Sequence, residues 1–200
     1  MTTEEAEVRK RLSVVVVLVE IASAALLVFL LERKVVPDAT GILLIVLFPI
    51  AFGLHVTEEF IAPGGFIAWN HIYRPKLVDT PGSFYVKANT YPAILAFLFA
   101  AGSFNYRGGY GGGLPSWLAF LTFMSWNAIY HLRGAIRTRR YSPGMVTGLA
   151  LFIPLAAASY AHLLEKGVVN GPIAALCAGT ALVIQPILDL MKGRGRKKAA

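Results

Sequence analysis

LSVVVVLVEIASAALLVFLL, residues 12–31, is an apolar run of twenty residues with one charged residue, Glu20. A helix needs about 20 mostly apolar residues to cross the hydrocarbon core of a bilayer. Arg9-Lys10-Arg11 precedes the run, as in a signal peptide, but apolar residues continue beyond the small residues at 22–24 where cleavage would occur. This pattern predicts a retained membrane-spanning helix.

The composition of the whole chain also indicates that the protein lies in a membrane. Apolar residues make up 56% of the 200 residues and charged residues only 15%, whereas a soluble domain has about 25% charged residues. A chain of this composition cannot cover its surface with polar groups in water, and it is too apolar to be disordered. Its single cysteine, Cys177, excludes a disulfide-stapled secreted scaffold. The sequence therefore predicts a polytopic membrane protein.

Five more stretches have the length and apolar character of spans, so the sequence predicts an all-α bundle of six transmembrane helices. The bundle forms a single transmembrane domain over residues 1–200, with basic tails at 1–11 and 192–200. An even number of spans places both termini on one side of the membrane. After the run at 12–31, the predicted spans are Gly41–Ala62, Phe84–Phe104, Leu114–Arg133, Gly144–Leu164 and Val169–Met191.

The distribution of basic residues orients this bundle. Of the 19 Lys and Arg residues, 15 lie in the tails or near helix ends on the side of the termini. Basic residues accumulate on the cytoplasmic side, so both termini are predicted to be cytoplasmic, in a bacterial inner membrane. Topology and contact with anionic lipid headgroups then explain the net charge of +8, and no nucleic-acid partner is predicted. The four basic residues on the opposite side are Arg33, Lys34, Arg107 and Lys166.

Polar residues inside the predicted spans gather in the cytoplasmic half of the bilayer. Such residues are costly in a membrane and usually face a partner or a cavity. His55, Glu58 and Glu59 share one face of the second span at the 100° per residue of an α-helix. Asn127 and His131, spaced i and i+4, share a face of the fourth span. Polar residues of the other spans at this depth are Glu20, Asn89 and Asp189.

Histidines and carboxylates on facing helices are the groups with which helix bundles bind metals. Nitrogen and oxygen ligands without a thiolate suit Zn, Fe or Mn, so we expect one or two divalent ions here. The same groups would equally serve metal-free acid–base catalysis. Interhelical hydrogen bonding alone would not require three ionisable groups on one helical face. The predicted ligands are His55, Glu58, Glu59 and His131, with Glu20 and His71 as further candidates, and the predicted catalytic residues are Glu58, Glu59, Asn127 and Asn89.

Two other histidines allow different interpretations. His162 and Glu165 repeat the His-x-x-Glu spacing, but they lie at the outer end of the fifth span, so we interpret them as interfacial residues. His71 follows Trp69-Asn70 in the cytoplasmic loop. It either folds back over the site or anchors this loop at the membrane interface.

His55-Val56-Thr57-Glu58-Glu59 and the elements that follow it resemble the bacterial HXXEE-domain membrane proteins, over roughly residues 43–155. The resemblance implies a protein of unknown function, suspected to be an enzyme because of its His, Glu and Asn motifs. It implies no particular substrate. The later matching elements are Phe60, Pro63, Phe66, Trp69-Asn70, Asn89, Asn127-Ala128-Ile129-Tyr130-His131 and Tyr141-Ser142-Pro143-Gly144.

We hypothesise a membrane-embedded metal-dependent enzyme, a hydrolase or an oxidoreductase, that acts on a lipid or isoprenoid-like substrate from the cytoplasmic leaflet. Its metal would activate water or oxygen. One alternative is a metal-free lipid isomerase with Glu58 or Glu59 as the proton carrier. Another is a proton-coupled transporter or small-ligand binding protein, although the chain has no inverted repeat. The metalloprotease motif H-E-x-x-H is absent, so proteolysis is not predicted.

Overall fold

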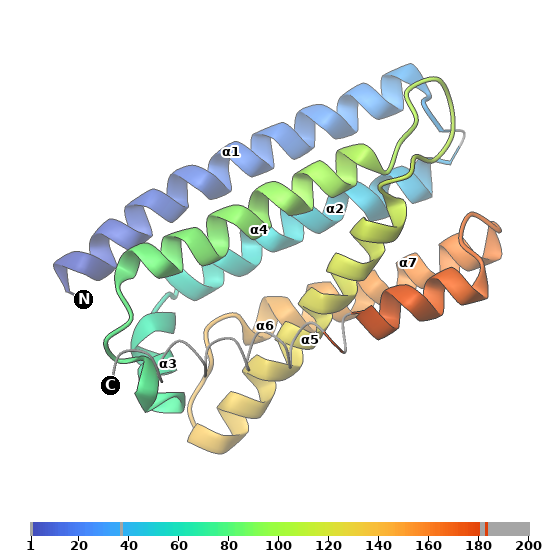
Figure 1. The fold of residues 1–200 in the computed structure, drawn as a ribbon. Coiled ribbons are helices and arrows are strands. Elements are labelled where there is room, and N and C mark those ends of the chain that lie inside the picture. Colours follow the sequence, from blue (N-terminus) through green and yellow to red (C-terminus); the bar gives the residue numbers. More distant parts are fainter. Residues whose placement is uncertain (1, 37, 181–182, 184–200) are drawn as a thin grey trace, which may run out of the picture.

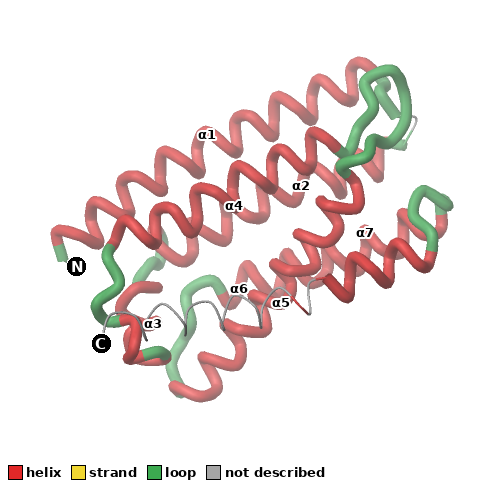
Figure 2. Tube along the Cα trace, viewed as in Figure 1, coloured by secondary structure: helices red, strands yellow, loops and turns green. Residues whose placement is uncertain are grey.

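A computed structural model describes residues 2–36, 38–180 and 183 of the chain. Helices account for 80% of the structure, and the described ranges contain no β-strand (Figures 1 and 2). The prediction of an all-α bundle is therefore confirmed.

Three long helices lie side by side and form one part of the bundle (Figure 1). They are α1 (Thr3–Arg33), α2 (Ala39–Val56) and α4 (Gly82–Gly102). Helix α1 begins with a capping box, in which the Thr2 hydroxyl accepts from the Glu5 N–H and the Glu5 carboxylate accepts from the Thr2 N–H. Two backbone N–H groups at the start of this helix are thereby satisfied.

The second part of the bundle crosses the first at an angle (Figure 1). It contains α5 (Leu114–Thr138) and a continuous helical segment made of α6 (Met145–Thr147), η3 (Gly148–Phe152) and α7 (Ile153–Glu165). Aromatic side chains fill the junction between the two parts. Trp117 and Phe152 both pack edge-on against Phe48, with ring centroids 6.3 and 6.1 Å apart, and the Trp117 indole N–H donates to the Ile45 carbonyl at 3.2 Å.

Two π-helical turns interrupt the helices that carry the polar residues. Helix α2 ends in the first, η1 (Thr57–Ile61), where the Ala62 N–H donates to the Thr57 carbonyl five residues back, at 2.8 Å. The second is η3, and the Ser125 hydroxyl donates to its last carbonyl, that of Phe152, at 3.1 Å. Such turns are rare and frequently occur at functional sites.

A short helix closes the end of the bundle that holds the N-terminus (Figure 1). This helix, α3 (Phe66–Tyr73), lies within the connection between the second and third predicted spans and is followed by a 3-10 turn, η2 (Pro75–Leu77). At the opposite end, the loop between α4 and α5 lies against the turn between α1 and α2, where the Gly109 N–H donates to the Val35 carbonyl at 3.0 Å.

Three helical segments are long and apolar enough to cross a membrane, namely Thr3–Arg33, Ala39–Ile61 and Met145–Glu165. They correspond to the first, second and fifth predicted spans. The third and fourth predicted spans correspond to α4 and α5, which are long but less apolar. The sixth corresponds to a helix at Gly171–Thr180, and its remainder lies outside the described residues. These helices are consistent with a membrane protein, while six spans and cytoplasmic termini stay predictions.

Candidate metal centre

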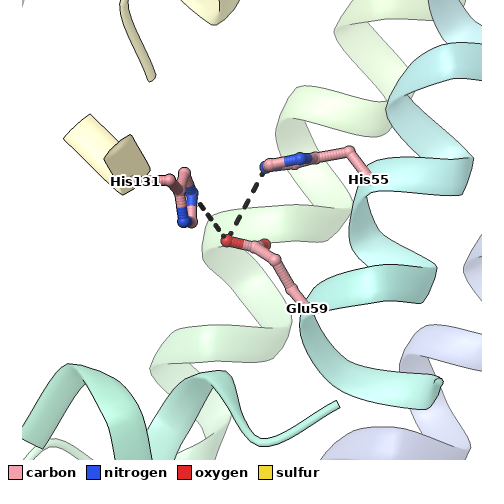
Figure 3. Close-up of side chains that lie close together, drawn as sticks. All are labelled: His55, Glu59 and His131. Atoms are coloured by element: carbon pink, nitrogen blue, oxygen red, sulfur yellow. Dashed lines mark ion pairs between the residues drawn. The ribbon is translucent and has the colours of Figure 1, made fainter. Parts of the chain in front are cut away.

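Three buried side chains meet where α5 crosses the end of α2. His55 lies on the last α-helical turn of α2, Glu59 in the π-helical turn that follows, and His131 on α5. The Oε1 atom of Glu59 lies 3.2 Å from His131 Nε2 and 3.7 Å from His55 Nε2, so both dashed lines in Figure 3 end on one oxygen. One ligand atom from each residue lies within 4.8 Å of the others, so this group could hold a metal ion.

A hydroxyl group contacts the far nitrogen of each histidine. His55 Nδ1 lies 3.0 Å from Thr147 Oγ1, and His131 Nδ1 lies 2.9 Å from Ser142 Oγ. The Thr147 hydroxyl donates its proton to Glu58, so it must accept from the Nδ1–H of His55. In this tautomer the Nε2 lone pair of His55 faces Glu59. Metal-binding histidines usually donate their other N–H to a polar group in this way.

Glu58 does not join the group, although the sequence predicted it as a ligand. Its carboxylate accepts hydrogen bonds from the Tyr141 and Thr147 hydroxyls and from the backbone N–H groups of Val146 (3.0 Å) and Thr147 (2.6 Å). Consecutive residues of a helix point in directions about 100° apart, so Glu58 and Glu59 need not face the same group. Both lie in the π-helical turn η1, where Glu58 faces the start of α6 and Glu59 faces His131.

Asn127 lies between the two histidines. Its Nδ2 atom is 3.2 Å from His55 Nε2 and 3.3 Å from His131 Nε2. An amide nitrogen there donates one hydrogen to each imidazole, whereas the flipped amide presents its oxygen, a metal ligand. Asn127 therefore lies within hydrogen-bonding distance of both histidines.

Close packing leaves little space around the group. The Trp69 ring stacks on the His131 ring at 5.9 Å, and the Phe152 ring lies 5.1 Å from the His55 ring. A Cβ atom on Gly144 would lie 2.7 Å from the His55 ring and 2.8 Å from the His131 ring, and this residue has a φ of +95°. Both the space and the backbone conformation therefore require glycine here.

The other predicted residues lie outside this group. Asn89 donates to the Tyr85 carbonyl of its own helix at 2.9 Å. Glu20 of α1 packs against Gly53 of α2. Gly53 and His55 are two residues apart and point in directions about 200° apart, so Glu20 packs on a different face of α2 from the one that carries His55. The Nε2 atom of His71 lies 3.5 Å from the Tyr85 hydroxyl, so His71 folds back toward the bundle. Asp189 lies outside the described residues.

The residues that hold the candidate ligands in place were not predicted from the sequence. Ser142 and Thr147 provide the hydroxyls behind the histidines, and Tyr141 donates to Glu58. Tyr141-Ser142-Pro143-Gly144 was noted only as an element of the family resemblance. A signal did exist, because this polar segment precedes an apolar span on the same predicted side of the membrane as His55 and His131.

A second polar cluster lies at the opposite end of the bundle. The Asp38 carboxylate accepts from the Tyr110 hydroxyl at 2.6 Å, from His162 Nε2 at 2.7 Å and from the Gly41 N–H at 3.1 Å. Burial alone would raise the pKa of Asp38, but these hydrogen bonds lower it to about 2. His162, which the sequence suggested to be interfacial, thus connects the end of α7 to the start of α2.

The chain matches one family of known proteins. Residues 46–159 match the model of a family described as proteins of unknown function with an HXXEE motif. No curated protein and no solved structure matches the chain. The matched region covers more than half of the 200 residues and includes His55, Glu59, Asn127 and His131. The chain therefore belongs to the HXXEE-motif family, as the ordered elements of its sequence indicated.

Proposed function

We propose that the protein is a membrane-embedded, metal-dependent enzyme in which His55, Glu59 and His131 bind one divalent cation. One observation carries this proposal: two buried imidazole Nε2 atoms face the same buried carboxylate oxygen. Three acceptors that converge in a buried space need either protons or a cation between them, because a bare carboxylate and imidazole lone pairs repel one another.

The spacing of the ligand atoms supports a metal. Tetrahedral Zn²⁺ with bonds of about 2.0–2.2 Å has ligand atoms about 3.4 Å apart, and the two distances to Glu59 Oε1 are 3.2 and 3.7 Å. Three protein ligands are typical of catalytic zinc, whose fourth position holds water or substrate. Two histidines and one carboxylate are also the ligands of non-haem iron oxygenases. The proposed cation is accordingly Zn²⁺ or Fe²⁺.

A cation here would supply an activated water for hydrolysis or, if it is iron, a site for oxygen. The protein's own residues position and shield the group. Glu58 holds the Thr147 hydroxyl, which in turn orients the His55 ring. Asn127 lies close enough to both histidines to hydrogen-bond a fourth ligand or to serve as one. Trp69 and Phe152 exclude bulk water from the two imidazoles.

The surroundings support a lipid-like substrate. The group lies at the end of α2, a helix long and apolar enough to cross a membrane, and the side chains packed on the histidines are aromatic. A water-soluble polar substrate would lose its hydration in such surroundings without regaining hydrogen bonds. We therefore propose that a membrane lipid reaches the group from the cytoplasmic leaflet.

Elemental analysis of the detergent-purified protein tests the metal directly. We expect about one equivalent of zinc or iron in the wild-type protein and none above background in a His55→Ala variant. His162→Gln is the matched control, because it removes a histidine from the other cluster and should keep the metal. The proposal is wrong if the wild-type protein binds neither metal after reconstitution with Zn²⁺ or, without oxygen, with Fe²⁺.

A metal-free lipid isomerase is the second candidate, favoured by the position of Asn127. Its amide nitrogen can donate one hydrogen to each imidazole, which satisfies both histidines without an ion. Glu59 would then be the group that moves a proton on and off the substrate. This enzyme would incorporate deuterium from D₂O into an unsaturated lipid at an undiminished rate in the presence of a chelator, and the metal-dependent enzyme would not.

A further inference from the structure

A cavity of about 310 Å³ opens at the end of the bundle that holds the N-terminus. Residues between Phe60 and Ala68, which directly follow the HXXEE motif, form most of its wall. Glu5 and Arg9 of α1 complete its lining. The cavity therefore lies where a lipid headgroup would meet the protein if the first span is oriented as its basic residues predict.

Only one layer of aromatic side chains separates this cavity from the candidate metal site formed by His55, Glu59 and His131, here called the metal group. Phe60 is the residue after Glu59, and its ring lies 5.4 Å from the ring of Phe66. The Phe66 ring in turn lies 5.6 Å from the His131 ring. Both phenylalanines line the cavity, and Phe66 is only partly buried. Phe66 therefore contacts both the cavity and the His131 ring.

The lining combines apolar walls with one cation. Phe60, Ile61, Phe66 and Ile67 supply the apolar surface. Arg9 supplies the positive charge, and its guanidinium makes no ion pair with any residue that the structure describes. A guanidinium matches the geometry of a phosphate group better than any other side chain does.

Backbone N–H groups make the polar rim of the cavity more favourable to an anion. Helix α3 begins here after Gly65, without a side chain that caps its first N–H groups, so these N–H groups carry a partial positive charge. The carboxylate of Glu5 is the only acidic group in the lining, and it already accepts the Thr2 N–H at 2.7 Å.

We infer that this cavity binds the phosphodiester headgroup of a membrane phospholipid and presents that lipid to the metal group. The inference rests on the proposed function and names its substrate class. A phosphodiester carries a single negative charge, which can pair with the one arginine of the lining, Arg9, while the uncapped N–H groups at the start of α3 partly offset the charge of Glu5. A pyrophosphate, as in an isoprenoid pyrophosphate, carries more charge than this lining neutralises, so a phospholipid is the better match within the lipid-like substrates expected from the sequence.

Native mass spectrometry of the full-length protein in detergent, titrated with dioleoyl phosphatidylglycerol, tests the cavity. Arg9→Gln should weaken binding of the first lipid roughly tenfold, because a charge-assisted hydrogen bond is lost. Lys10→Gln is the matched control, since this exposed neighbour carries the same charge but does not line the cavity. Its effect should stay within about twofold. Equal effects of the two substitutions would overturn the inference.

A second variant tests the space rather than the charge. Ala68 is exposed and lines the cavity, so Ala68→Trp should fill it and weaken lipid binding without disturbing the core. Unchanged affinity in this variant would show that the lipid binds elsewhere. Glycerophosphoglycerol, the water-soluble headgroup, should not compete at equal concentration. If it competes as well as the lipid does, the cavity serves a free phosphodiester and the inference of a lipid is wrong.

Metal content of the same samples keeps the two proposals separate. Arg9→Gln and Ala68→Trp should retain the metal of the wild-type protein, because neither residue contacts His55, Glu59 or His131. Lipid binding by the cavity together with a metal-free wild-type protein would contradict the proposed enzyme alone. A metal-loaded protein in which Arg9→Gln and Lys10→Gln behave alike would contradict the lipid site alone.

Discussion

The two ends of the bundle each hold a carboxylate beside histidine, yet the hydrogen bonds differ in kind. Asp38 faces three donors, namely the Tyr110 hydroxyl, His162 and a backbone N–H. Glu59 faces two imidazole nitrogens, and the tautomer of His55 turns a lone pair toward it. The Asp38 cluster is complete in itself and connects helices. The Glu59 group brings one carboxylate oxygen and two imidazole nitrogens close together, so it could hold a metal ion.

Glu59→Gln should produce the largest difference between the two ends. Glutamine keeps the size of the side chain but removes the charge that attracts a cation, so we expect metal affinity to fall at least about 100-fold. Asp38→Asn, the equivalent change in the other cluster, should leave the metal content unchanged. Metal titration followed by elemental analysis measures both, and equal losses in the two variants would show that the ends do not differ as described.

Thr147→Val should have the next largest effect. It removes the hydroxyl that links the His55 Nδ1–H to Glu58, and such supporting groups typically contribute 10- to 100-fold to metal affinity. Thr180→Val is a suitable control, because the Thr180 hydroxyl only donates to a carbonyl of its own helix. Metal titration of both variants tests the prediction, which fails if Thr147→Val binds metal as tightly as Thr180→Val.

Gly144→Ala should destabilise the protein by about 2 kcal/mol and displace the histidines. The added methyl group would meet both imidazole rings, and the positive φ of +95° adds backbone strain. Gly108→Ala separates the two causes, since this residue also has a positive φ, +121°, but nothing lies within 4 Å of its added Cβ. Thermal unfolding in detergent gives the stability, and only Gly144→Ala should also lose metal. Loss of metal in both variants would contradict the packing argument.

The smallest effect concerns the pH dependence of the Asp38 cluster. The pKa of Asp38 is about 2 in the folded protein, below its ordinary value of 3.8. The cluster therefore stabilises the fold fully above about pH 4, and this contribution disappears as the pH falls toward 2. We expect less than about 1 kcal/mol, because the cluster is partly solvated. Lowering the pH from 4.5 to 2.5 should reduce the free energy of unfolding of the wild-type protein by this amount more than that of Asp38→Asn. Parallel curves of unfolding free energy against pH for the two proteins would disprove the prediction.

Regular helix geometry accounts for the part of the site that could be predicted from the sequence. His55 and Glu59, like Asn127 and His131, are spaced i and i+4, and this spacing brings each pair to one helix face. The pairing of α2 with α5 also followed from depth in the membrane. Helices were similarly predictable wherever a long apolar run was present, as at Thr3–Arg33.

The remaining features of the site depended on contacts between segments that lie far apart in the sequence. No sequence pattern showed that the start of α6 would lie against Glu58, so Glu58 was predicted as a metal ligand. Ser142 and Thr147 reach the histidines only because the start of α6 folds against α5, a contact between segments that periodicity does not relate. Asn89 was predicted from its depth in the membrane and from the family resemblance, yet its amide bonds to a carbonyl of its own helix.

Polar side-chain contacts join helix α2 to the segment Met145–Glu165 at both ends of the pair. His55 contacts Thr147 at one end, and Asp38, the cap of α2, contacts His162 at the other. Sliding one helix along the other by a single turn, about 5.4 Å, would break both contacts at once. These two contacts therefore fix the position of one helix along the other. The segment 60–73 is held in another way, since the rings of Phe66 and Trp69 pack on His131 of α5.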